Sequence, residues 1–217
     1  MPIINMVYKK KKWWQPWANT LAYLKLEQNT NDSSWKWNNG TGTNITYTTL
    51  VTWKKVAYFN GSSKINFSSS LFSSWAFTCS VYVYWTWLNT SSWLNVIMWN
   101  AYSDSQWYYS DHHWAYLRSY VNNVWAGVNW YYSNDNRFLL TVTYDGATIK
   151  AYKNWTLIAT ASQSTFSWVR NYYLWYRAYS NDRYWKWYMS DFICENKART
   201  SDEIAKYYNS TKSNYWL

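Results

Sequence analysis

Apolar and polar residues alternate strictly over residues 76–84. Phe77, Cys79, Val81 and Val83 share one parity, and the positions between them hold threonine, serine and tyrosine. Successive side chains of a strand point to opposite faces of its sheet, so this pattern predicts a strand with one buried face. We therefore expect Phe77 and Val81 in the core.

Weaker versions of this pattern recur along most of the chain. Residues 21–27 alternate, which places Leu24 in the core, and residues 29–42 are so rich in Asn, Asp and Ser that they predict a loop. Two short strands are expected on either side of Asn60-Gly61, at 56–59 and 64–67. Further strands are expected near residues 94–100, 114–121, 124–131, 171–178 and 187–195.

The clearest strand pattern covers residues 138–161. Three apolar or β-branched runs are separated there by Asp145-Gly146 and Asn154-Trp155. Asp-Gly is typical of a two-residue type I′ turn, and Asn154-Trp155 would match it if Trp155 stood in place of glycine. We expect a three-strand meander in which Trp155 is exposed and has left-handed or strained backbone angles. Its core residues should be Leu140, Val142 and Ile149.

One helix is predicted near residues 200–208. Thr200-Ser201-Asp202-Glu203 is a capping box, in which the Thr200 hydroxyl accepts from the Glu203 N–H and the Glu203 side chain reaches back. Roughly a dozen short strands and a single helix predict an all-β fold, a sandwich of antiparallel sheets.

Length and charge limit the classes of protein to consider. The 217 residues are enough for one β-sandwich. We divide them into a basic N-terminal arm at residues 1–19, which contains Lys9–Lys12, and a sandwich domain at residues 20–217. The net charge of +10 is otherwise scattered, so no nucleic-acid binding is expected. No apolar stretch approaches the roughly 18 residues of a membrane helix, and no signal peptide is visible, so no membrane insertion is expected.

The two cysteines carry little functional information. Cys79 and Cys194 each lie inside a predicted strand. Two cysteines cannot build a disulfide-dense scaffold, so we expect buried free thiols. A single disulfide between them is the alternative.

Tryptophan is abundant where glycine is expected. The chain has 21 Trp and 5 Gly, although average usage of about 7% predicts roughly 15 glycines. Trp follows Ser, Asn or Pro in pairs that would be turn signals with glycine, as at Trp17, Trp35, Trp93 and Trp155. We hypothesise that many Trp positions are UGA codons that mean glycine in the source organism, a recoding known in some bacterial lineages. UGG codons at most of these positions would exclude the hypothesis.

A genuine tryptophan-rich surface for stacking sugars or bases is the alternative. Such a surface places aromatic residues at period 2 on one strand face or together in one groove. The tryptophans here are instead scattered from Trp13 to Trp216. Under the recoding hypothesis, Trp35, Trp37 and Trp93 are exposed loop residues, less buried than Phe77 or Phe138.

With these tryptophans taken as glycine, four segments resemble laminin-G-like domains of the concanavalin A-like lectin/glucanase superfamily. Residues 21–42 then become LAYLKLEQNTNDSSGKGNNGTG, similar to the first strand and loop, and 56–66 (VAYFNGSSKIN) resemble the next strand pair. Residues 140–161 resemble the central meander, and 187–207 the closing strand and helix. The resemblance implies a jelly roll of two antiparallel sheets, one of them concave, that usually works as a binding module.

The resemblance also implies a structural Ca²⁺ near the first and last strands. Glu27 ends the first strand and Asp191 lies in the last, at the matching positions, although the family more often has Asp at the first. Carboxylates and backbone carbonyls are the ligands that Ca²⁺ prefers, and a shared ion requires the two carboxylates within about 10 Å. The alternative is that both are ordinary acids at a strand edge.

Catalytic groups are sparse. Retaining glycoside hydrolases need two carboxyl groups about 5 Å apart, whereas the three glutamates, Glu27, Glu195 and Glu203, are far apart in the sequence. Asp111-His112-His113 lacks further ligands at zinc-site spacing. We therefore expect no enzymatic activity.

Sugar binding needs aromatic rings and polar groups on an open face. Residues 102–118 and 173–179 are richest in both. The alternative is a polar sheet face that binds nothing. The candidate ligand-binding residues are Tyr108, Tyr109, His112, Arg118, Tyr176, Arg177 and Tyr179.

We therefore expect a non-enzymatic module that binds carbohydrate or another surface ligand in adhesion. Its expected location is extracellular, at a cell surface or on a virion. The alternative is a structural or attachment module of a phage tail or cell-surface assembly, in which the sandwich makes contacts within an oligomer or larger particle. The lysine-rich arm and the lack of a visible signal peptide favour that alternative.

Overall fold

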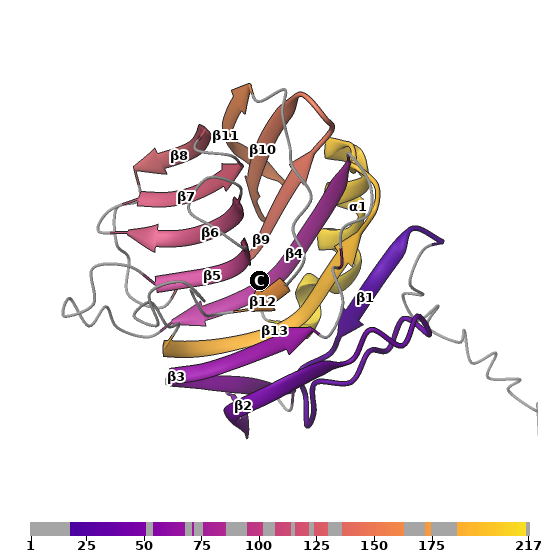
Figure 1. Cartoon of the computed structure of the whole chain (residues 1–217), viewed down its shortest axis with the longest axis vertical. Coiled ribbons are helices and arrows are strands. Elements are labelled where there is room, and N and C mark those ends of the chain that lie inside the picture. Colours follow the sequence, from indigo (N-terminus) through magenta and orange to yellow (C-terminus); the bar gives the residue numbers. More distant parts are fainter. Residues whose placement is uncertain are drawn as a thin grey trace, which may run out of the picture.

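A computed structural model describes eleven stretches of the chain: 18–50, 54–67, 71, 76–85, 95–101, 107–113, 116–121, 124–129, 136–162, 172–174 and 186–215. Most of the predicted basic arm lies outside them. The described residues form thirteen strands and, near the C-terminus, one α-helix and a 3-10 helix (Figure 1). The elements are β1 (Thr20–Leu24), β2 (Gly40–Thr49), β3 (Lys55–Phe67), β4 (Phe77–Trp85), β5 (Asn95–Ala101), β6 (Trp107–His113), β7 (Tyr116–Val121), β8 (Val124–Asn129), β9 (Asn136–Tyr144), β10 (Thr148–Lys153), β11 (Thr156–Ser162), β12 (Tyr172–Leu174), β13 (Lys186–Glu195), α1 (Ser201–Thr211) and η1 (Lys212–Asn214).

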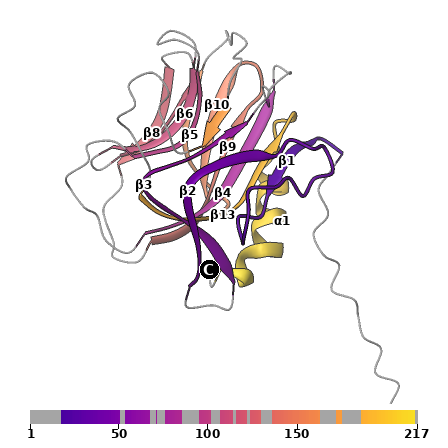
Figure 2. The same ribbon diagram turned by 60° about the horizontal axis from the view of Figure 1, so that its bottom comes forward.

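The strands form a β-sandwich, as the alternation predicts, with the jelly-roll arrangement that the resemblance implies. Their order is β11-β10-β9-β4-β13-β3-β12-β5-β6-β7-β8, with β1 on β13 and β2 on β3. All of the strand pairs are antiparallel. The path folds over on itself, so that β11 contacts β8 and two layers result (Figure 2).

The core lies between the layers and contains the residues that alternation predicts. Leu24, Phe77, Val81, Leu140, Val142 and Ile149 are all fully buried. Cys79 and Cys194 pair across β4 and β13 in this core as buried free thiols, with their sulfurs 3.6 Å apart. The prediction of free thiols is confirmed, and burial raises the pKa of Cys194 well above its ordinary value.

Helix α1 covers part of the outer face of the sheet. Its capping box forms as predicted, with Thr200 at the N-cap and Glu203 closing the second bond. Tyr207 and Tyr208 pack against Tyr82, Leu139 and Ile193, which face away from the main core. The helix ends at Thr211, three residues beyond the predicted end, and η1 follows directly.

Strand β13 changes partner halfway along its length. Residues 186–189 pair with β3, and residues 192–195 pair with β1. The change falls at an irregularity in the β4 register, where Asp191 has φ +48° and its N–H donates to the Lys25 carbonyl at 3.2 Å. This β-bulge brings a buried carboxylate to the junction of the first and last strands.

The prediction of two short strands on either side of Asn60-Gly61 is wrong, because residues 55–67 form one strand, β3, of 13 residues. Gly61 has φ +88°, but the chain does not turn back. Residues 60–63 instead bulge opposite Asn44, and the pairing with β2 resumes on both sides. The Asn60 side chain holds this bulge by accepting from the Ser62 N–H at 2.9 Å and from the hydroxyls of Ser62 and Ser63.

The meander of β9, β10 and β11 is confirmed, but neither of its turns is the predicted type I′. Tyr144 pairs with Ile149, so the first loop holds four residues, which the Asp145 carboxylate holds by accepting from the N–H groups of Ala147 and Thr148. The second loop has two residues, yet only Asn154 has a positive φ, +60°. The left-handed backbone predicted at Trp155 is therefore wrong, because Asn154 alone supplies it while exchanging hydrogen bonds with Leu139.

Exposure of the tryptophans follows the recoding hypothesis. Trp35 and Trp37 are 81% and 82% exposed and have φ of +67° and +61°. Trp155 is 48% exposed, whereas Phe77 and Phe138 are fully buried. Trp93 lies outside the described residues. Bulky side chains rarely adopt this left-handed backbone, and two exposed indoles gain little from it.

Candidate functional site

A row of four large side chains crosses the outer face of the sheet beyond helix α1. The row consists of Arg137 (β9), Tyr84 (β4), Tyr188 (β13) and Tyr58 (β3). Strand register brings them together, because Tyr84 pairs with Arg137 on one side and with Tyr188 on the other, and Tyr188 also pairs with Tyr58. Directly paired residues share a face, so the four side chains stand on neighbouring strands in one line.

The rings of this row pack against one another. Tyr84 and Tyr188 are stacked with centroids 5.6 Å apart, and Tyr188 and Tyr58 are tilted at 5.0 Å. The Arg137 guanidinium lies over the Tyr84 ring at 4.5 Å. All four side chains are half-buried. Because neighbouring rings cover each other's faces, the row presents ring edges, phenol hydroxyls and guanidinium N–H groups.

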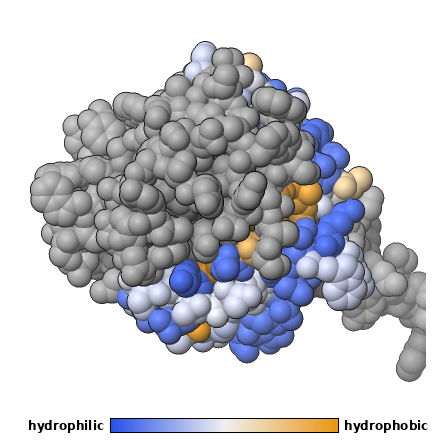
Figure 3. Space-filling model, in the orientation of Figure 1, coloured by the Kyte–Doolittle hydropathy of each residue, from blue (hydrophilic) through white to orange (hydrophobic). Residues whose placement is uncertain are grey.

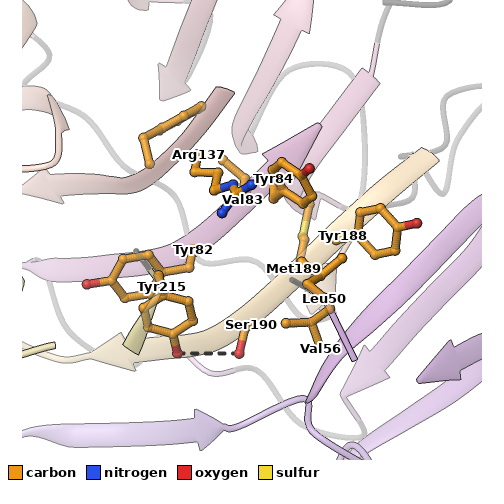
Figure 4. Close-up of a pocket in the computed structure, with 11 residues that line it drawn as sticks. Leu50, Val56, Tyr82, Val83, Tyr84, Arg137, Tyr188, Met189, Ser190 and Tyr215 are labelled. Atoms are coloured by element: carbon orange, nitrogen blue, oxygen red, sulfur yellow. Dashed lines mark hydrogen bonds between the residues drawn. The ribbon is translucent and has the colours of Figure 1, made fainter. Parts of the chain in front are cut away.

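A small hollow adjoins the row. It is lined by Tyr84, Tyr188 and Arg137 together with Tyr82, Tyr215 and apolar residues that include Leu50 and Val56 (Figure 4). Its volume of about 30 Å³ leaves room for roughly two water molecules. A ligand larger than that would have to lie across the row rather than inside the hollow.

The described surface in the view of Figure 3 is mainly hydrophilic, with small apolar areas between polar ones.

Tyr215, which lines the hollow, belongs to a network of donors that holds Asp191. Its carboxylate accepts from the Tyr23 hydroxyl at 3.0 Å, from the Tyr215 hydroxyl and from the Lys54 ammonium at 3.3 Å. Burial, followed by the charge of Asp191, raises the pKa values of Tyr23 and Tyr215 far above that of an ordinary phenol. Both tyrosines therefore stay protonated and act as donors.

The structure brings together the two acids predicted to bind calcium. Lys54 Nζ lies 3.2 Å from Glu27 Oε1 and 3.3 Å from Asp191 Oδ2. The Lys54 ammonium is therefore already the cation that both carboxylates contact. As arranged, the residues do not fit a Ca²⁺ ion in addition to this ammonium. Across the described stretches, no three His, Cys, Asp or Glu side chains gather where they could hold a metal ion.

The predicted ligand-binding residues are only partly placed. Tyr108, Tyr109 and His112 belong to β6 and Arg118 to the adjacent β7. In the backbone register of these two strands, Arg118 lies opposite Asp111. Tyr176, Arg177 and Tyr179 lie outside the described residues.

Sequence reasoning missed the tyrosine row. Alternation over 76–84 already indicates that Tyr84 faces away from the core. The other three residues belong to strands whose register with β4 has no local sequence signal, so nothing in the sequence groups them.

All three glutamates form ion pairs with a cation. Glu27 pairs with Lys54, Glu195 with Arg199 and Glu203 with Lys197. The Glu203 pKa is lowered, first by its hydrogen bond from Lys197. Burial raises the Glu195 pKa to about 7 in spite of Arg199.

The described strands place this chain in the class of β-sandwich domains, and solved structures of other proteins have the same fold. Domain 4 of a GH43 extracellular arabinanase from Geobacillus stearothermophilus, in complex with arabinotriose, matches with a TM-score of 0.72 and 19% identity, over 87% of this chain and 97% of that one.

Binding domains of botulinum neurotoxins also match. That of neurotoxin DC, in complex with SialylT, has a TM-score of 0.65 and 15% identity over 88% of this chain. A type C structure described by an interaction with two ganglioside molecules has a TM-score of 0.63 at 15% identity. This chain spans about half of those toxin chains. At such identities these likenesses show the fold alone.

No family model and no curated protein matches the sequence. Among the described residues, no helix combines the length and hydropathy needed to cross a bilayer.

Proposed function

We propose that this chain is a non-enzymatic carbohydrate-binding module that holds its ligand on the tyrosine row. The observation that carries the proposal is the line Arg137–Tyr84–Tyr188–Tyr58, which displays hydroxyls and a guanidinium on one sheet face. Sugar hydroxyls are both donors and acceptors, so phenol hydroxyls and guanidinium N–H groups match them.

Two further observations support a binding role without catalysis. The neighbours of the same fold that are solved in complex with arabinotriose and with SialylT are domain 4 of an arabinanase and the binding domain of a neurotoxin. Each of the three glutamates is ion-paired with a lysine or arginine, and Glu27, which does lie near a second carboxylate, shares the Lys54 ammonium with Asp191 instead of leaving the space between the two carboxylates open to a sugar.

The laminin-G-like relationship, an adhesive role and an extracellular or surface location belong to this proposal. Display of the domain outside a cell or on a virion would bring the row to glycosylated surfaces. The predicted set Tyr108, Tyr109, His112, Arg118, Tyr176, Arg177 and Tyr179 is the alternative position for the same ligand.

The first test removes hydroxyls from the row without changing ring packing. We expect the double variant Tyr84→Phe/Tyr188→Phe to lose roughly tenfold or more in affinity for glycans that the wild-type protein selects on an array. Each lost hydrogen bond is worth about 0.5–1.5 kcal/mol, and about 1.4 kcal/mol is a tenfold change. Isothermal titration measures the loss, and the thermal midpoint should stay unchanged.

Tyr47→Phe is the matched control for this variant. Tyr47 is another half-buried strand tyrosine, but it pairs with Ala57 and packs toward the core. Its loss of a hydroxyl should leave binding intact. Unchanged binding in the row variant, together with loss in Tyr176→Phe/Arg177→Gln, would contradict the row and favour the alternative set.

A second candidate function is a structural or attachment module of a phage tail or surface assembly. The run Lys9–Lys12 favours it, because a basic arm can dock on an acidic neighbouring subunit. Under this function no glycan on the array would bind. The neighbouring genes would encode particle proteins.

A further inference from the structure

The cation between Glu27 and Asp191 belongs to the protein itself. Lys54 Nζ contacts one oxygen of each carboxylate at 3.2 and 3.3 Å, and its side chain is 11% exposed. The ammonium also lies 4.8 Å from the centroid of the Tyr215 ring. Three distant parts of the chain therefore meet at one charged group: the segment after β1, the residue before β3, and β13.

The Asp191 carboxylate needs a positive partner. Its side chain is 4% exposed, and burying a carboxylate without a counter-charge is costly. Its backbone has φ +48° within the β13 bulge. Such strained conformations persist where surrounding contacts fix them, and here the contacts converge on the carboxylate.

A divalent cation and the Lys54 ammonium cannot share these oxygens. An ion coordinated by Glu27 Oε1 and Asp191 Oδ2 would lie beside Nζ, and two positive charges at such distance repel strongly in a partly buried site. The ammonium supplies three donors in a tetrahedral arrangement, whereas calcium needs six to eight oxygens. The geometry therefore suits one cation or the other.

We propose that Lys54 is a built-in replacement for a structural calcium ion, which makes closure of the first strand on the last independent of divalent cations. Removing the side chain would convert the Glu27–Asp191 pair into a vacant carboxylate site that accepts Ca²⁺. This inference does not rest on the proposed sugar binding, and each can fail without the other.

The test compares thermal midpoints of the full chain in EDTA and in 5 mM CaCl₂. The wild-type midpoint should move by less than about 1 °C between the two conditions. Lys54→Ala should melt several degrees lower in EDTA, since about 1 kcal/mol corresponds to roughly 2–4 °C at this size. It should regain much of that loss in CaCl₂ by mass action. Titration calorimetry with CaCl₂ alone should find one site per chain in the variant.

Two further variants make the outcome specific. Lys55→Ala removes an exposed neighbouring lysine and should respond like the wild type. Lys54→Ala/Asp191→Asn should lose the calcium response of the single variant. The proposal is overturned if the wild type is stabilised by calcium, if Lys54→Ala melts like the wild type, or if Lys54→Ala is destabilised but indifferent to calcium.

Discussion

Replacing Arg199 by methionine is expected to lower the free energy of unfolding by about 3–5 kcal/mol at pH 8. Arg199 Nε pairs with Glu195 Oε2, and the two side chains are only 2% and 3% exposed. Removing one partner of a buried pair leaves the other charge uncompensated, which accounts for a loss of this size. Urea unfolding of the two proteins measures it.

The same loss should be smaller at pH 5, by up to about 1.4 kcal/mol, because pH 8 lies one unit above the wild-type Glu195 pKa of about 7 and one unit is worth about 1.36 kcal/mol. Burial already raises the Glu195 pKa to about 7, while the Arg199 charge lowers it. Without Arg199 the folded-state pKa moves higher still, so Glu195 is protonated at pH 5 and needs no counter-charge. A carboxyl group whose pKa is raised on folding stabilises the folded state at pH values below its ordinary pKa, near 4.5. This stabilisation is lost as the pH rises through the folded-state pKa. The deficit of Arg199→Met should therefore grow between pH 5 and pH 8.

The double variant Arg199→Met/Glu195→Gln is the control for this explanation. It has no titrating group at the pair, so its difference from the wild type should lack the steep rise with pH. Equal deficits of Arg199→Met at pH 5 and pH 8 would show that the guanidinium acts by packing, for instance over the Tyr207 ring at 5.0 Å.

Replacing both Trp35 and Trp37 by glycine should raise the free energy of unfolding by about 1–3 kcal/mol. Left-handed backbone costs a bulky residue about 1–2 kcal/mol, and both indoles are more than 80% exposed. The greater chain entropy of glycine when unfolded offsets part of the gain. The loop itself should persist, because the Asp32 carboxylate accepts from backbone N–H groups at Tyr23, Ser34 and Asn38.

Trp155→Gly is the matched comparison. Trp155 lacks a positive φ, and its ring lies 4.8 Å from that of Tyr208. Trp155→Gly should therefore lower stability slightly, whereas Trp35→Gly/Trp37→Gly should raise it. A loss of stability in Trp35→Gly/Trp37→Gly would remove the structural support for glycine at these two positions. UGA codons at both positions would strengthen the hypothesis that they encode glycine.

The local sequence pattern predicts more of the fold than of the candidate site. Alternation identifies which face of β4 and β9 is buried, because one parity is apolar in each strand. It misses β2, where GTGTNITYTT is polar at almost every position and is mostly exposed. The row on the outer face depends on the register between four strands. The Lys54–Asp191 contact joins residues 137 positions apart.

The partner change of β13 also sets the order in which this chain can fold. Residues 186–195 form the middle of the sheet, between β4 on one side and β3 and β1 on the other. During synthesis the strands already made would expose unsatisfied edges until this segment emerges from the ribosome. Such non-local closure slows folding and lengthens the exposure of strand edges to other chains. The late arrival of β13 therefore leaves the edges of β4 and β3 that face it unpaired until residues 186–195 have been made.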